Sequence, residues 1–157
     1  MTSAFLTDLL TAILALLLLV AAVVDVRTFT ISNKLVLVVA LLAPVFWWSA
    51  GIDLWPDAAW RVGVALLVFA GLAATFYLGM MGGGDVKLAA ALTLWFSPRT
   101  TLKFLVLMSI AGGVLTLLAL VAHKIRKSEG RPEIPYGVAI AFGGLWLVAQ
   151  RFLNHFA

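Results

Sequence analysis

Long apolar runs separated by short polar breaks are the feature of this sequence that most limits its possible folds. A helix needs about 20 mostly apolar residues to cross the hydrocarbon core of a bilayer. The chain has 64% apolar and only 11% charged residues, whereas a soluble domain has roughly 25% charged residues. One buried core cannot hide so much apolar surface. We therefore expect an all-α membrane protein, a polytopic bundle of about six transmembrane helices in one domain, residues 1–157, with spans at residues 4–24, 35–48, 58–78, 86–96, 102–122 and 134–152.

The basic residues predict how such a bundle is oriented. Six spans place the first, third and fifth loops on one side of the membrane. Cytoplasmic loops are enriched in lysine and arginine, and the net charge of +4 fits this enrichment better than nucleic-acid binding. We expect this side to be cytoplasmic and both termini to lie outside, because it holds seven of the eleven basic residues: Arg27, Lys34, Lys87, Lys124, Arg126, Lys127 and Arg131.

The fourth run, residues 86–96, is too short to span a bilayer. Its eleven residues cover only ~16 Å at 1.5 Å per residue, about half of the hydrocarbon core. The segment before it reads GMMGGGDVK, residues 79–87. Non-helical backbone is tolerated at membrane depth only where protein buries it or water reaches it. We therefore expect a glycine loop that lines a cavity and allows another backbone to approach closely.

Two acids lie next to apolar spans at the predicted cytoplasmic side. Asp25 ends the first span and Asp85 begins the fourth. Acids in such places are costly and usually functional. Two carboxyls in one partly dry cavity tend to hold one proton between them. The ionised one can then activate a water as general base, and the protonated one can donate to a carbonyl oxygen.

Other roles for these acids stay open at this point. Asp85 is also placed to cap the fourth helix, and Asp25 is placed to pair with Arg27. The same two acids would also suit proton or cation binding in a small proton-coupled transporter, which would place its acids nearer the bilayer midplane. The acids alone do not decide between these roles.

The sequence predicts no metal site and no cofactor. It contains no cysteine, which excludes disulfides, thiolate metal sites and cysteine nucleophiles. His123 and His155 have no partner at ligand spacing. Ser32 and Asn33 are expected to cap the second helix.

Three motifs in order along the chain give it a family resemblance. GMMGGGDVK resembles the GxGD signature of membrane aspartic proteases, with Gly82, Gly84 and Asp85 on the motif. DVRTFTISNKL, residues 25–35, resembles the first-aspartate motif of type IV prepilin peptidases, although Ser32 stands where the family often has proline. IPYGVAIAFGG, residues 134–144, resembles the family's Pro-Tyr-Gly-x-Ala-Ile-Ala segment.

The resemblance implies a prepilin peptidase, an aspartic endopeptidase of the bacterial inner membrane. Its catalytic pair would be Asp25 and Asp85, acting at the cytoplasmic face on prepilin or pseudopilin precursors within the lipid bilayer. The absence of cysteine implies the short class without a methyltransferase domain, as in tight-adherence (Flp-type) pilus systems. A preflagellin-type or presenilin-like GxGD protease is the alternative within enzymes. The supporting residues that the motifs imply are Arg27, Asn33, Gly79, Gly82, Gly83, Gly84, Lys87, Pro135, Tyr136 and Gly137.

Overall fold

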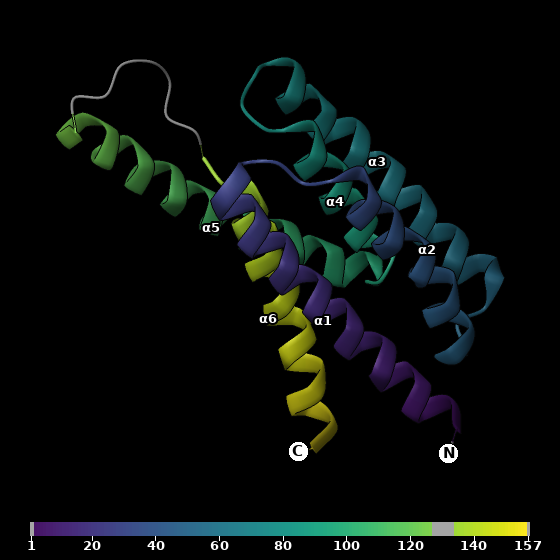
Figure 1. Cartoon of the computed structure of the whole chain (residues 1–157). Helices are drawn as coiled ribbons and strands as arrows, with labels where there is room; N and C mark the ends of the chain where they lie inside the picture. Colours follow the sequence, from purple (N-terminus) through teal and green to yellow (C-terminus); the bar gives the residue numbers. More distant parts are fainter. Residues whose placement is uncertain (1, 127–133, 157) are drawn as a thin grey trace.

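The computed structural model of the chain describes residues 2–126 and 134–156, and the regular secondary structure of this part is helical (Figure 1). The expected all-α bundle is confirmed. A five-residue π-helical segment, η1 (Leu54–Ala58), leads into the third helix. The six α-helices are α1 (Thr2–Thr28), α2 (Asn33–Ser49), α3 (Ala59–Tyr77), α4 (Gly83–Thr93), α5 (Pro98–Arg126) and α6 (Tyr136–Phe156).

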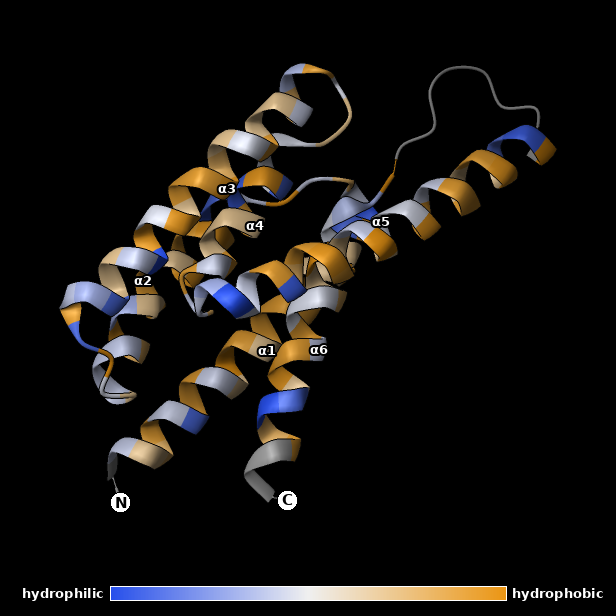
Figure 2. Cartoon of the chain, turned by 180° about the vertical axis from the view of Figure 1, so that it is seen from behind, coloured by the Kyte–Doolittle hydropathy of each residue, from blue (hydrophilic) through white to orange (hydrophobic). Residues whose placement is uncertain are grey.

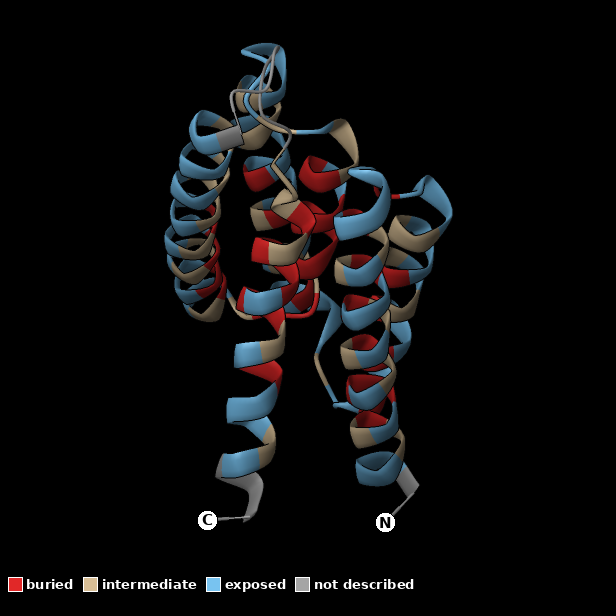
Figure 3. Cartoon of the chain, turned by 60° about the vertical axis from the view of Figure 1, so that its left-hand side comes forward, coloured by how far each residue is buried: buried red, intermediate tan, exposed pale blue. Residues whose placement is uncertain are grey.

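The helices alternate in direction, so successive connections lie at opposite ends of the bundle. Both chain ends lie at one end, which we call the terminal end (Figures 1 and 3). The connection from α1 to α2 and the glycine segment before α4 lie at the other, which we call the aspartate end. The basic residues Lys127 and Arg131 of the fifth loop lie outside the described residues.

Four helical stretches are long and apolar enough to cross a membrane: Ser3–Thr28, Leu54–Tyr77, Pro98–Ile125 and Tyr136–Leu153. Many large hydrophobic side chains on them are exposed, and the ribbons of α1 and α5 are orange over much of their length (Figure 2). α2 is shorter, with 17 residues, and α4 has only 11.

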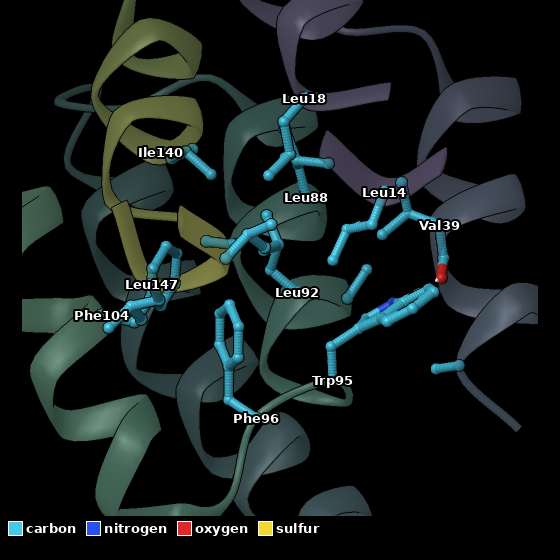
Figure 4. Close-up of a cluster of buried hydrophobic side chains, with 14 of the residues drawn as sticks. Leu14, Leu18, Val39, Leu88, Leu92, Trp95, Phe96, Phe104, Ile140 and Leu147 are labelled. Carbon is cyan, nitrogen blue, oxygen red and sulfur yellow. Dashed lines mark hydrogen bonds between the residues drawn. The ribbon is translucent and has the colours of Figure 1, made fainter. Parts of the chain in front are cut away.

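The short helix α4 forms the centre of the bundle. It packs against α2, α3 and α6. Every residue from Asp85 to Thr93 except Lys87 is buried. Leu88 and Leu92 lie among core side chains of α1 and α6 (Figure 4), and three consecutive alanines, Ala89 to Ala91, allow neighbouring helices to approach closely. Surrounding protein, rather than lipid, therefore covers a helix that cannot span the bilayer by itself.

Two tryptophans join the turn after α4 to α2. The indole nitrogen of Trp47 donates to the carbonyl of Leu94, at 2.8 Å, just beyond α4. That of Trp95 donates to the carbonyl of Val39 on α2, at 3.0 Å. A polar backbone group without a partner is costly in an apolar environment. These bonds explain how the chain can turn after α4 inside the protein.

The start of α4 differs from the sequence-based prediction. Gly82 is the residue before the helix, and Gly83 and Gly84 form its first turn, so the predicted glycine loop is wrong at these two positions. The turn itself uses Gly79, whose φ of 68° favours glycine. Two glycines are tolerated in the helix because helix termini rely on tertiary contacts more than on intrinsic propensity.

Candidate active site

Asp25 lies in the last turn of α1 and is almost fully buried, with 1% of its surface exposed. Its carboxyl faces the start of α6, where the backbone amides of Gly137 and Val138 lie beside it. The N-terminus of a helix carries a partial positive charge and favours a nearby anion. The first turn of α6 is therefore placed to donate hydrogen bonds to the Asp25 carboxyl.

Gly137 is the residue that lets α6 come so close to Asp25. A Cβ atom at this position would lie 2.7 Å from Oδ2 of Asp25 and 2.7 Å from Cδ1 of Ile31. Real Cβ atoms do not make such short contacts. Any side chain at position 137 must therefore displace the carboxyl, Ile31 or the helix.

The turn between α1 and α2 brings the chain back over Asp25. α1 ends at Thr28, and Phe29 has a φ of 49°, a left-handed conformation that costs a non-glycine residue about 1–2 kcal/mol. Ser32 then caps α2 by accepting a hydrogen bond from the Leu35 amide at 3.3 Å. Between them, Ile31 turns inward and is buried.

Asp85 lies in the first turn of α4 and is 7% exposed. Burial, and then the charge of Asp25, raise the pKa of Asp85 to about 7, although the Gly82 amide opposes this. The two acids, sixty positions apart in sequence, are thus within electrostatic reach of one another. At neutral pH the pair can hold a single proton.

Two contacts hold the Asp25 side of the site against the Asp85 side. A Cβ at Gly84 would lie 2.6 Å from the carbonyl oxygen of Ile31, so the turn after α1 rests directly on the first turn of α4. The Lys87 ammonium on α4 donates to the side-chain oxygen of Asn33 on α2 at 3.0 Å. Lys87 and Asn33, both predicted as supporting residues, are therefore brought together.

Of the other supporting residues that the sequence predicted, some lie beside the two acids and others contact different side chains or are exposed. A Cβ at Gly82 would lie 2.8 Å from Oδ2 of Asp85, and one at Gly83 would lie 3.3 Å from the Phe76 ring. Pro135 precedes α6, and the Tyr136 hydroxyl lies 3.2 Å from the Thr116 hydroxyl on α5. Arg27 is exposed.

The carboxyls keep hydrogen-bonding capacity for a further group. Within residues 2–126 and 134–156, Oδ2 of Asp25 and Oδ1 of Asp85 are buried and have no hydrogen-bond partner. The buried Oδ2 is thus not paired with Arg27. One ionised and one protonated carboxyl with free oxygens can together activate a water and protonate a carbonyl.

Three contributors to the site were missed from the sequence. Ile31 joins the two halves, the Val138 amide faces Asp25, and Thr116 holds Tyr136. Ile31 lies within the first-aspartate motif and Val138 within the Pro-Tyr-Gly segment, so the motifs carried a signal for both. Nothing in the sequence marked Thr116, which acts through a contact between two helices.

Comparison with known proteins gives one match. The sequence profile of the type IV leader peptidase family matches residues 12–117, well over half of the chain. The matched region contains Asp25 and Asp85, and the Pro-Tyr-Gly segment lies beyond it. No curated protein and no solved structure matches the chain.

Proposed function

The chain belongs to the type IV leader peptidase family, and on that premise we propose that it is a prepilin leader peptidase with Asp25 and Asp85 as its catalytic pair. The family is one of proteases, which favours peptide hydrolysis over proton-coupled transport. We assign the catalytic pair to Asp25 and Asp85 because both carboxyls are buried, interact electrostatically and lie inside the region that matches the family. The substrates we propose are pilin-like precursors, including those of the Flp type, and the test is removal of their leader peptide.

The proposed reaction uses a water molecule and no covalent intermediate. Asp25, beside two backbone amides, is ionised and takes a proton from the water as its oxygen attacks the carbonyl carbon of the scissile peptide bond. Asp85, with its raised pKa, donates its proton to the carbonyl oxygen. The tetrahedral intermediate then collapses. A proton passes to the amide nitrogen, the C–N bond breaks, and the pair regains its single proton.

We further propose that Gly84 and Gly137 allow neighbouring segments of the chain to approach the two acids closely. Gly84→Ala and Gly137→Ala should each lower the rate of leader removal at least roughly tenfold, since overpacking of about 1–3 kcal/mol falls on the parts that hold the acids. The two added Cβ atoms would contact Ile31 and Asp25 at 2.6 and 2.7 Å. The measurement is the cleavage rate per amount of membrane-inserted protein.

Gly71→Ala provides the matched control. Gly71 lies within α3, and an added Cβ there would meet nothing within 4 Å. This variant should cleave at the wild-type rate. Equal losses in all three variants would remove the support for close approach at the site.

We propose that the protein lies in the bacterial inner membrane with its aspartate end facing the cytoplasm. In this cysteine-free chain, a membrane-impermeant thiol reagent applied to intact cells should label Asp53→Cys and leave Met80→Cys unlabelled. Both positions are exposed and lie at opposite ends of the bundle. After the cells are opened, both should label. Labelling of Met80→Cys alone in intact cells would place the acids on the wrong side for a cytoplasmic leader.

A further inference from the structure

A cavity of about 520 Å³ lies at the terminal end of the bundle, away from the two aspartates. Side chains of α1, α2, α3, α5 and α6 line it together with the turn after α4. Three of the lining residues are cationic: Arg61, Lys103 and Arg151. Polar groups of Ser97, Thr100 and Gln150 lie among them, and no acid is found in the lining that the described residues provide.

The gathering of these cations is unexpected for their side of the membrane. The terminal end holds four basic residues of the described part of the chain: Arg61, Arg99, Lys103 and Arg151. Basic residues are depleted on the outer side of a membrane protein. Three of the four nevertheless converge on one cavity instead of spreading over the surface.

Arg61 is the member of this group that most needs a ligand. Its Nη1 atom is buried and has no hydrogen-bond partner among the described residues. The charged side chains of Asp57 and Arg151 lie within electrostatic reach of Arg61. Arg151 in turn lies over the ring of Phe46, with its guanidinium carbon 5.1 Å from the ring centroid. A guanidinium group with a buried, unused donor is best satisfied by an anion that accepts several hydrogen bonds.

Exposed tryptophans indicate at which level of the membrane the cavity lies. Trp48, Trp55 and Trp60 lie at the same end of the bundle, and each exposes 65% or more of its surface. Tryptophans of this kind gather at the headgroup level of a bilayer. Arg61 and Lys103 lie near the first turns of their helices and Arg151 lies near the last turns of its own. The cations therefore lie at the level where lipid phosphates are found.

From these observations we infer that the cavity binds the phosphate group of an anionic phospholipid of the outer leaflet, with Arg61, Lys103 and Arg151 as its ligands. The site is separate from the aspartate pair and does not depend on the proposed protease function, and its place in the outer leaflet rests on the orientation proposed above. Basic residues between helices at the membrane surface are a known means of holding lipid headgroups.

Native mass spectrometry of the full chain in detergent tests this inference. The wild-type protein should retain phosphatidylglycerol and not phosphatidylcholine. Arg61→Gln, Lys103→Gln and Arg151→Gln should each weaken phosphatidylglycerol binding roughly fivefold, as expected for one cation near a lipid surface. Arg61→Lys, which keeps the charge, should lose less than Arg61→Gln.

Arg99→Gln is the matched control, because Arg99 is an exposed cation of the same end that does not line the cavity. It should bind as the wild type does. Equal weakening by Arg99→Gln, or retention of phosphatidylcholine as strong as that of phosphatidylglycerol, would overturn the inference. Inorganic phosphate that binds as tightly as the lipid and displaces it would make this a site for a soluble anion and would equally overturn the lipid assignment. If Arg61→Gln does not fold, the Lys103→Gln and Arg151→Gln variants test the inference instead, because both residues are exposed.

Discussion

Asp25→Asn and Asp85→Asn are each expected to slow leader removal by roughly 10²–10⁴-fold or more, the contribution of a positioned general acid or base. Asparagine keeps the shape of the side chain but can neither take a proton from water nor hold one for the carbonyl oxygen. Both acids are buried, and a neutral asparagine introduces no charge at either position. The variants should therefore insert in the membrane at wild-type levels while losing activity. The measurement is the single-turnover rate of cleavage of a pilin-like precursor.

The double variant distinguishes a catalytic pair from two independent contributors. Because the acids would act as one unit, Asp25→Asn combined with Asp85→Asn should lose little more than either single variant. Asp53→Asn is the control, since Asp53 is exposed at the terminal end and should retain full activity. Near wild-type cleavage by either single variant would show that the pair is wrongly assigned.

The pH dependence of cleavage is the second large effect. Asp85 must carry a proton to donate it, and its pKa is raised to about 7. Above that pH the carboxyl loses its proton, so kcat/KM should fall toward tenfold per pH unit and lie roughly 50-fold lower at pH 9 than at pH 7. At low pH the second carboxyl is also protonated and no general base remains, so the profile should be bell-shaped. Its two limbs describe the pair and not either residue alone.

Return of the enzyme from pH 9 to pH 7 separates titration from unfolding. Full recovery of kcat/KM would exclude irreversible unfolding as the cause of the upper limb. A rate that stays constant or increases between pH 7 and pH 9 would contradict a protonated Asp85 as the proton donor.

The overall fold follows from the sequence because apolar runs predict membrane helices by a strong physical constraint. All six helices overlap the expected spans, and the alternation of helix direction brings Asp25 and Asp85 to the same end. Ser32 caps α2 as its residue type suggests, whereas Asn33, also expected as a cap, is the first residue of the helix and accepts a hydrogen bond from Lys87. These features depend on local composition and on chain topology, which a sequence contains.

The features that the sequence did not predict come from contacts between distant segments. Gly83 and Gly84 have poor intrinsic helix propensity, yet they form the first turn of α4 because that helix is packed on several sides. The approach of α6 to Asp25 depends on a single missing Cβ at Gly137. Similarly, the sequence assigned Arg61, Lys103 and Arg151 to one side of the membrane, but only the packing of five helices reveals their shared cavity.

The most direct test of the proposed function is mass spectrometry of the N-terminus of a pilin-like precursor incubated with the purified wild-type chain. The product should lack its basic leader and carry one new N-terminus, and a chelator or serine- and thiol-directed reagents should not change the rate. The Asp85→Asn protein should leave the precursor intact under the same conditions. An intact precursor with the wild-type chain, or zinc-dependent cleavage that persists in Asp85→Asn, would contradict a two-aspartate leader peptidase.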